Sequence, residues 1–503
     1  MTAQIDVCLV LEGTYPYVVG GVSSWVHDLI KAQSGLTFYG ASLIAEAKPP
    51  QMRFEPPPNF VNHAPISLQR LAPGRPDEAL ARRLFQDLEG PLTRLLHRGG
   101  LAELREVLAL VAPLRGRIGR AVVLDSRAAF DCVERMYDAA MPGASFLDYF
   151  WTWRALVGGL MAVLLAPVPE ARLYHTISTG YAGLLAARMG IETGRPVLLT
   201  EHGIYTNERR IEIAMADWLH AGDSQGLGIE KPRRDLRDLW IDAFVAYARA
   251  TYEASAEIIT LYGGNQDLQR REGAPPEKLK VIPNGIDYPR FSGIARDTAD
   301  RRPTVALIGR VVPIKDLKTF IRAIGILRNQ VPDVLADILG PAEEDPPYAE
   351  ECRRMVAHLG LENNVRFLGR VKLDDHLGRI DAIVLTSISE AQPLVMLEAG
   401  AAGIPSVVTD VGSCREMIHG RPGVDQHLGP GGAVTPVASP DATAAALARL
   451  LTDRTWWHAC STAMKERVRT SYNKVEIDRI YGGLYREHLG ATSPRTLRAG
   501  GAI

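Results

Sequence analysis

Two successive series of short apolar runs, separated by glycine-containing loops and helical stretches, constrain the fold of this chain most strongly. Several runs are apolar throughout and rich in β-branched residues, which is typical of strands covered on both faces. Because strands that alternate with helices form parallel sheets, the pattern predicts an α/β protein with two doubly wound, Rossmann-like domains. The predicted strands are 5–11, 37–43, 171–174, 197–200, 258–261 and 279–282, and then 304–308, 334–339, 365–368, 382–386, 406–409 and 433–435.

The boundary between the two series lies near residues 283–287, where Pro, Asn and Gly punctuate the chain. The stretch 288–303 is polar and carries no clear period, so it suits a linker. We therefore expect a first domain at 1–287 and a second domain at 288–472.

Residues 67–168 break the alternation, because this segment is almost wholly helical in pattern. Leucines recur there at helical spacing, at Leu80, Leu84, Leu88 and Leu92 and again at Leu101, Leu104 and Leu108. We interpret the segment as a helical insertion in the first domain. A last helix at 473–489 either closes the second domain or crosses back onto the first, and the small, polar, basic tail 490–503 is expected to be mobile.

The composition of the chain excludes several classes of function. Of 503 residues, 46% are apolar and 23% are charged, enough to bury large cores. Lys and Arg number 57 against 58 for Asp and Glu, a balance that argues against a nucleic-acid-binding surface over the whole protein. The five cysteines are scattered without a C-x-x-C pair, so a disulfide framework or zinc site is not expected and a reducing cytoplasm is favoured. The first apolar run reads as a strand rather than a signal peptide, and the longest apolar stretch, 156–168, is too short to span a membrane.

Two glutamates, Glu390 and Glu398, follow a predicted strand of the second domain. Pro393 suits the first position of a helix, since it lacks only an N–H that would be unpaired there, and Leu394 and Val395 then offer free backbone N–H groups to an anion. One carboxylate would lie on each side of that anion. Because carboxylates accept hydrogen bonds from vicinal hydroxyls, this arrangement indicates a site for a sugar and a ribose that flank a diphosphate. The structural alternative is a helix-start charge and a solvated glutamate.

Two cations, Arg310 and Lys315, come directly after the predicted strand 304–308. The carboxyl end of a parallel strand is the usual ligand crevice of this fold class. A guanidinium fork and a compact ammonium at that edge could together neutralise a diphosphate leaving group. Solvated loop residues are the alternative.

The loop after the first strand contains Gly20 and Gly21 just before a predicted helix. Two glycines there would let the backbone approach a phosphate closely at the helix start. The loop is neither G-x-G-x-x-G nor a P-loop, so a glycine turn that serves tight packing is the alternative.

A histidine, His202, follows the strand 197–200 and could donate to a ligand hydroxyl. His175 holds a comparable place after the preceding strand and ranks below it, and either histidine could be structural. A dense charged cluster surrounds His202, namely Glu201, Glu208, Arg209 and Arg210. The chain has neither a metal-site spacing nor a Gly-x-Ser-x-Gly nucleophile elbow.

These motifs together resemble the retaining glycosyltransferases of family 4, which have the GT-B fold. The resemblance rests on Glu390 and Glu398 with seven residues between them, Gly309-Arg310 followed by Lys315, the Gly20-Gly21 loop, and Pro-Asn-Gly-Ile-Asp at 283–287. It covers nearly the whole chain except the helical insertion. One departure is Asp316, where the family usually has Gly.

Three further segments, 10–17, 20–25 and 200–205, resemble the members of this family that act in the cytoplasm in Pel exopolysaccharide synthesis. The helical insertion fits that subgroup. The resemblance implies a UDP-linked hexose or N-acetylhexosamine as donor, a polysaccharide acceptor, and recruitment to the inner membrane by a Pel synthase and export complex.

The resemblance also implies a role for each matching residue. Arg310 and Lys315 would grip the diphosphate, Glu398 the ribose hydroxyls, Glu390 the sugar hydroxyls, Gly21 the phosphates and His202 the sugar, while the backbone of Gly369, Arg370 and Val371 would face the base, expected to be uracil. Fixed cations and a helix N-terminus could stabilise the leaving diphosphate without a metal or other cofactor. A GT-B epimerase or phosphorylase and a non-catalytic nucleotide-sugar-binding subunit remain as alternatives.

Overall fold

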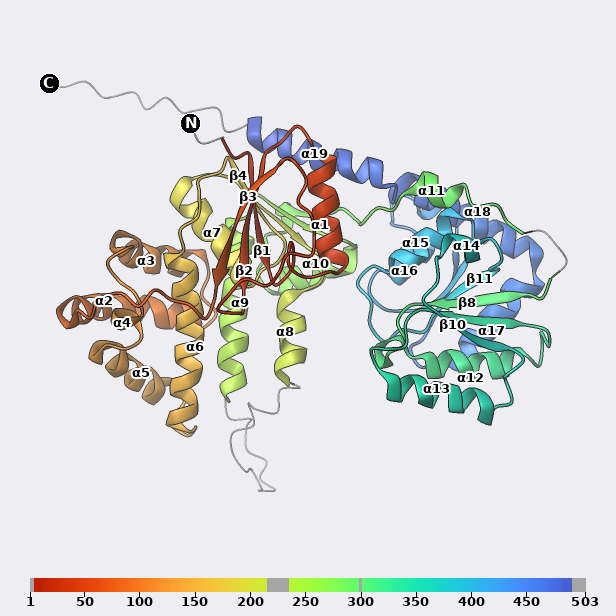
Figure 1. Cartoon of the computed structure of the whole chain (residues 1–503), viewed down its shortest axis with the longest axis horizontal. Coiled ribbons are helices and arrows are strands. Elements are labelled where there is room, and N and C mark those ends of the chain that lie inside the picture. The colour runs from red at the N-terminus through yellow and green to blue at the C-terminus, as the bar shows by residue number, and fades with distance from the viewer. Residues whose placement is uncertain (1–3, 215–234, 298–300, 491–503) are drawn as a thin grey trace. The chain divides into compact units, whose positions relative to one another are not determined.

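The computed structural model describes residues 4–214, 235–297 and 301–490. These residues form two compact units (Figure 1). Unit 1 contains the described residues up to Thr260, Gln266–Lys280 and those from Gly482, and unit 2 contains Leu261–Asn265 and Val281–Tyr481. The tail predicted to be mobile lies outside the described residues, except for Gly490.

Unit 1 is built on a seven-stranded sheet in the order β3-β2-β1-β4-β5-β6-β7, with parallel pairing from β3 through β6. The strands are β1 (Val7–Glu12), β2 (Phe38–Ile44), β3 (Phe60–Ser67), β4 (Leu173–Thr176), β5 (Val197–Glu201), β6 (Glu257–Thr260) and β7 (Leu279–Val281). The helices outside the insertion are α1 (Gly21–Ala32), α7 (Tyr181–Thr193), α8 (Tyr205–Ala214), α9 (Leu236–Ala254) and most of α10 (Gly263–Arg271). The strand order reverses between β1 and β4, which is where doubly wound sheets bind ligands, at the strands' carboxyl ends.

The helical insertion is present in unit 1 and adds to its core. Its helices are α2 (Glu78–Leu96), α3 (Leu101–Val111), α4 (Arg120–Val123), α5 (Arg127–Ala140) and α6 (Phe146–Leu165). The leucines at helical spacing in α2 are buried in one apolar cluster with residues of β1 and α7. In Figure 1 these helices gather at one side of the sheet. Over the described residues, none of the helices combines the length and apolar character needed to cross a bilayer.

Unit 2 repeats the arrangement with a six-stranded parallel sheet in the order β10-β9-β8-β11-β12-β13. The strands are β8 (Thr304–Ile308), β9 (Leu335–Leu339), β10 (Val365–Gly369), β11 (Ala382–Leu385), β12 (Ser406–Thr409) and β13 (Gly432–Thr435). The helices are α11 (Tyr288–Ser292), α12 (Leu317–Leu327), α13 (Pro346–His358), α14 (Asp374–Leu377), α15 (Leu394–Ala401), α16 (Cys414–His419), α17 (Pro440–Thr452), α18 (Arg454–Ser471) and α19 (Lys474–Gly490). The last helix belongs to unit 2 up to Tyr481 and to unit 1 from Gly482. Here the order reverses between β8 and β11.

The prediction of two parallel-sheet α/β units is confirmed, and each predicted strand is present within a few residues of its expected ends. One strand was missed, the edge strand β3, which contains Pro65 and polar residues and therefore lacks a clean strand pattern. The linker prediction for 288–303 is wrong at its start. Asp287 caps α11 by accepting from the Arg290 N–H, and Phe291 buries its ring in the core of unit 2.

A glycine of the punctuating motif is required by close packing. A Cβ at Gly285 would lie 2.6 Å from Lys474 Cα, where the chain leaving the motif pairs with the start of α19. We expect Gly285→Ala to lower the free energy of unfolding by about 1–3 kcal/mol, measured by urea denaturation. The matched control is Gly325→Ala inside α12, where the new Cβ would make only ordinary contacts, at 3.8 Å or more. It should be neutral or slightly stabilising, and equal losses in both variants would contradict the packing argument.

Candidate active site

The topological switch of unit 2 brings two of the predicted constellations together. Arg310 and Lys315 follow β8, and Glu390 and Glu398 follow β11, the two strands that flank the reversal. Lys315 Nζ lies 2.5 Å from Glu390 Oε1, and the two side chains are only 19% and 12% exposed. The structure therefore joins a cation and a carboxylate that are 75 residues apart in sequence.

Hydrogen bonds from the end of β11 hold both partners of this ion pair. Ser387 Oγ donates to Glu390 Oε1 at 2.7 Å. Thr386 Oγ1 donates to the carbonyl oxygens of Lys315 and Asp316, at 3.0 and 2.9 Å. The ammonium and the carboxylate are thus fixed before any ligand binds, which lowers the cost of organising a site.

The backbone at Asp316 shows how this chain accommodates an aspartate where the family usually has glycine. Its φ of 44° lies in the left-handed region, where glycine is usual. Its side chain accepts from the Thr319 N–H at 3.2 Å and so caps α12, and Asp is among the few residues that tolerate this conformation. The turn after Lys315 is therefore preserved without glycine.

A third loop, after β12, presses against the Glu390 loop, and sequence reasoning missed it. Gly412 has a φ of +53°, and a Cβ there would lie 1.8 Å from the Glu390 carbonyl oxygen. The Ser413 N–H donates to the Ala391 carbonyl at 2.9 Å. The available signal was a Val-Gly-Ser turn directly after a predicted strand.

Arg310 lies in the same β8 loop as Lys315 but has a different partner. Its guanidinium donates to both carboxylate oxygens of Glu344, at 2.6 and 2.7 Å, and both side chains are about half exposed. An exposed pair of this kind contributes little stability. Arg310 could therefore exchange Glu344 for an anionic ligand at low cost.

Glu398 lies in the second turn of α15 and is half-buried. Burial raises the pKa of its carboxyl, while Arg290 opposes that shift and Asp374 adds to it. Arg290 and Asp374 form a two-pronged ion pair, with N–O distances of 2.9 and 2.8 Å. Pro393 is the N-cap of α15 rather than its first residue, a difference of one position.

Backbone groups complete this edge of unit 2. Leu394 and Val395 open α15, so their N–H groups have no acceptor within the helix. Gly369 ends β10 at a φ of 66°, and its carbonyl accepts from the Gly340 N–H at 2.9 Å. Arg370, directly after it, is exposed, and Val371 is half-buried.

In unit 1, the Gly20-Gly21 pair stands exposed at the start of α1. Gly20 is the N-cap with extended backbone, and a Cβ on either glycine would meet nothing within 4 Å. Contacts within the described chain thus do not require glycine at these two positions. That observation disfavours the tight-packing alternative.

Two of the histidines of unit 1, His175 and His202, have different surroundings. His175 is fully buried, with Nε2 2.9 Å from Thr200 Oγ1 and Nδ1 2.7 Å from the Tyr485 hydroxyl. Burial lowers its pKa to about 3, so this ring stays neutral and structural. His202 packs edge to face against Trp25 of α1 with 4.7 Å between ring centroids, closer than the 6.3 Å between Trp25 and His175. The fold therefore brings His202 to the helix that begins at the glycine pair.

Two carboxylates at strand ends in unit 1 were not assigned from sequence. Glu201 ends β5 and is 1% exposed, and Glu12 ends β1. The Tyr205 hydroxyl donates to Glu12 Oε1 at 2.6 Å, and the Tyr205 N–H donates to Glu201 Oε1 at 3.2 Å. Burial raises the pKa of both carboxyls, that of Glu201 to about 7.

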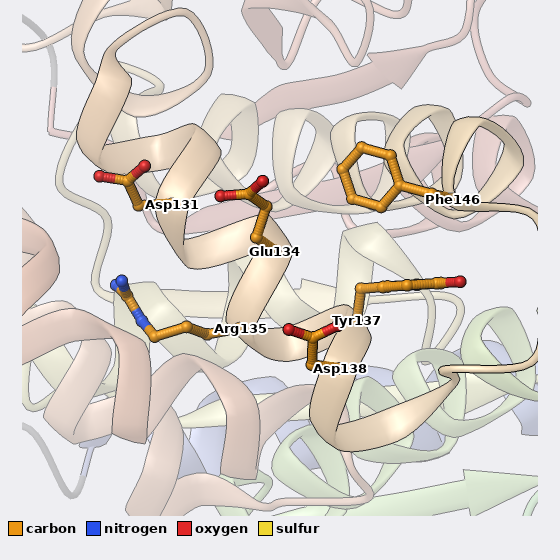
Figure 2. Close-up of a pocket in the computed structure, with 6 residues that line it drawn as sticks. All are labelled: Asp131, Glu134, Arg135, Tyr137, Asp138 and Phe146. Atoms are coloured by element: carbon orange, nitrogen blue, oxygen red, sulfur yellow. The ribbon is translucent and has the colours of Figure 1, made fainter.

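A surface pocket of about 470 Å³ is lined by none of these residues (Figure 2). Five of its labelled side chains come from α5 and the sixth, Phe146, begins α6; the five are Asp131, Glu134, Arg135, Tyr137 and Asp138. Within the described part of the chain, no group of three or more His, Cys, Asp or Glu side chains is placed to hold a metal ion.

Comparison with protein families matches both halves of the chain. Residues 5–277 match the family described as domain of unknown function (DUF3492). The chain belongs to the DUF3492 family. Residues 302–453 match the family described as glycosyl transferases group 1, so this DUF3492 protein carries a group 1 glycosyltransferase domain that contains the Lys315–Glu390 pair.

Curated relatives match part of this DUF3492 protein. A D-inositol 3-phosphate glycosyltransferase of Kineococcus radiotolerans is 30% identical over 215 residues, covering 38% of this chain and 48% of the relative. A GDP-mannose-dependent alpha-(1-6)-phosphatidylinositol monomannoside mannosyltransferase of Mycobacterium tuberculosis is 29% identical over 217 residues, covering 39% and 53%. The chain thus spans about half the length of the curated relatives it matches.

Solved structures share the fold over nearly the whole chain. Sucrose-phosphate synthase from Thermosynechococcus elongatus aligns with a TM-score of 0.55 at 17% identity, covering 97% of this chain and 100% of that one. Anabaena Alr3699/HepE in complex with UDP aligns with a TM-score of 0.56 at 14% identity, covering 96% and 100%. The DUF3492 protein therefore has the GT-B fold.

Glu201 gives a stability prediction. The folded carboxyl keeps its proton up to about pH 7, whereas the unfolded carboxyl loses it near 4.5. Between these values the folded state binds more protons, so raising the pH should lower the free energy of unfolding. Glu201→Gln cannot titrate. We expect the melting temperature of wild type relative to Glu201→Gln to fall across this window, and a constant difference would refute the buried titration.

Proposed function

We propose that this protein is a retaining glycosyltransferase that moves a hexose or N-acetylhexosamine from a UDP-sugar onto a growing exopolysaccharide of the Pel type, without a metal ion. The observation that carries the proposal is the Lys315–Glu390 ion pair at the switch point of a group 1 glycosyltransferase domain. Two cations and a helix N-terminus follow the two strands that flank the reversal, as a diphosphate requires.

The leaving diphosphate sets the main demand on the site. Negative charge grows on it as the bond to the sugar breaks, and fixed cations stabilise that charge most when they need not move. Lys315 is already held by Thr386 and Glu390. Arg310 would give up the exposed Glu344 to reach the same group. The α15 amides of Leu394 and Val395 would complete the anion site.

The remaining residues would position the donor. Glu398 would accept from the ribose hydroxyls and Glu390 from hydroxyls of the transferred sugar. Gly21 would lie against the phosphates, His202 near the sugar, and the backbone of Gly369, Arg370 and Val371 against the base. Since the departing phosphate can take the acceptor proton, Glu390 is assigned to positioning rather than to covalent catalysis.

Uridine is favoured over guanosine as the donor base by the family resemblance and by the UDP named for Anabaena Alr3699/HepE. The GDP-mannose named for the mycobacterial relative is the alternative. The resemblance of segments 10–17, 20–25 and 200–205 to the family members of Pel exopolysaccharide synthesis supports a cytoplasmic enzyme that inner-membrane Pel synthase and export proteins recruit.

A panel of UDP- and GDP-linked sugars separates the candidate functions. The proposal predicts that a UDP-sugar binds most tightly by calorimetry and that its sugar reaches a polysaccharide acceptor with its anomeric configuration retained. Preferred transfer from GDP-mannose would overturn the donor assignment. Conversion of a UDP-sugar without acceptor would indicate an epimerase, and binding without transfer, even in the assembled synthase, a non-catalytic subunit.

Lys315→Ala should lower turnover by about 100-fold or more, because it removes the best-ordered cation at the leaving group. Lys318→Ala, in the first turn of α12, removes a lysine that pairs with Glu351 on the surface and serves as the matched control. The control should keep turnover within a few-fold of wild type. Turnover of Lys315→Ala within a few-fold of wild type, with unchanged melting temperatures, would remove the assigned role.

Glu398→Ala should weaken UDP binding by about 10-fold or more, because charge-assisted hydrogen bonds to the ribose are lost. The exposed Glu362 in the same unit provides the control, Glu362→Ala. Calorimetry with UDP and with pyrophosphate distinguishes the two halves of the nucleotide. An unchanged UDP affinity, or an equal loss for pyrophosphate, would contradict the ribose assignment.

A further inference from the structure

Among the described residues, no cation forms an ion pair with the buried carboxylate of Glu201. It is 1% exposed at the end of β5 and accepts four hydrogen bonds from neutral groups. Oε1 receives the Thr179 hydroxyl and the Tyr205 N–H, both at 3.2 Å, and Oε2 receives the Tyr252 hydroxyl and the Gln269 amide, both at 3.0 Å. These donors come from the loop before α7 and from α8, α9 and α10.

A charge at this buried position lowers the free energy of unfolding, and a functional role for the charge would account for its presence. Burying a carboxylate among neutral groups disfavours folding far more than an apolar side chain would. Gln or Leu would fill the volume without that penalty. The fold nevertheless keeps a carboxylate directly before His202, at the carboxyl edge of the sheet where ligands bind.

The turn that carries His202 is anchored at its far end. Tyr205 is held twice, by its N–H on Glu201 and by its hydroxyl on Glu12. Glu12 also accepts from the Ala182 N–H at 3.0 Å, which ties β1 to the first turn of α7. The five residues from Glu201 to Tyr205 thus run between the buried carboxylate of Glu201 and the half-buried carboxylate of Glu12, and His202 packs onto Trp25.

We propose that Glu201 is a positioning residue: its ionised carboxylate holds the 202–205 turn in place, and with it His202, so that the transfer reaction requires the deprotonated form. The inference rests on the proposed function, which places His202 near the sugar.

The arrangement of hydrogen-bond donors around Glu201 favours the ionised form of its carboxyl group. A carboxylate accepts from all four donors as they stand, whereas a protonated carboxyl carries an O–H, so the hydroxyl of Thr179 or Tyr252 must turn from donor to acceptor. The titratable groups that act on Glu201 are Tyr252 on α9 and Glu272 after α10. Tyr205 on α8 links Glu201 to Glu12 on β1, and Arg209 on α8 acts on Glu12 and Tyr205. Burial, with Glu272 adding to it, raises the pKa of Glu201 to about 7.

The first test is the pH profile of kcat/KM for the transfer. Wild type should rise through a midpoint near 7, and Glu201→Gln should lose that step and remain about 10-fold or more below wild type on the alkaline side. Glu257→Gln is the matched control, because Glu257 begins the neighbouring strand β6 at the opposite edge of the sheet and pairs with Lys280. Its profile should follow wild type.

The second test does not depend on the folding of Glu201→Gln. Tyr252→Phe removes one donor to the ionised form while keeping the ring, so the midpoint should move to higher pH. A role in stability alone would lower the melting temperature and leave the midpoint unchanged. An unshifted midpoint, or a Glu201→Gln profile identical to wild type, would overturn the proposal.

Failure of the proposed function gives a different pattern. If no nucleotide-sugar is transferred by wild type, hydrogen exchange of the Tyr205 amide still reports on the turn. If protection of the Tyr205 amide in wild type, relative to Glu201→Gln, rises with pH through neutrality, the result supports the holding of the 202–205 turn by Glu201 independently of transfer activity. Equal protection at all pH values would refute it.

Discussion

The ion pair between Lys315 and Glu390 is the constraint on which unit 2 is organised. Both side chains are largely withdrawn from water, and removing either partner of such a pair leaves a charge that the surroundings must solvate. Thr386 and Ser387 at the end of β11 and Gly412 after β12 hold the two loops at contact distance. A pair assembled from three strand ends keeps a cation and a hydroxyl-binding acid in register before any donor arrives.

Much of the fold could be predicted, because strands buried on both faces appear in the sequence as continuous apolar runs. Apolar runs such as Thr304–Ile308 and Ser406–Thr409 are strands, as predicted. This pattern is lost where an element is only partly buried. The edge strand β3 buries only two of its eight residues and contains Pro65, and the helix α11 depends on a single buried ring, Phe291. Such elements are decided by tertiary contacts rather than by local pattern.

The residues of the candidate site also differ in whether the sequence alone could predict their roles. Lys315 and Glu390 could be assigned to the same edge of a sheet from sequence, because the carboxyl ends of parallel strands share one edge. That β8 and β11 are neighbours, which brings the two side chains into contact, is shown only by the structure. Glu201 could not be assigned, because its partners Tyr252 and Gln269 lie 51 and 68 residues further along the chain. Gly412 was missed for the same reason, since only the folded chain shows that a Cβ there would strike the Glu390 loop.

Lys315, held in place by Glu390, is the cation that we expect to receive the diphosphate. Calorimetry of Glu390→Gln with UDP, and with uridine as the control lacking phosphates, measures what this ordered ammonium contributes. UDP should bind more weakly than to wild type, because Lys315 loses the carboxylate that holds it, while uridine affinity stays unchanged. Unchanged or tighter UDP binding by a variant that folds like wild type would show that Glu390 does not prepare Lys315 for the diphosphate.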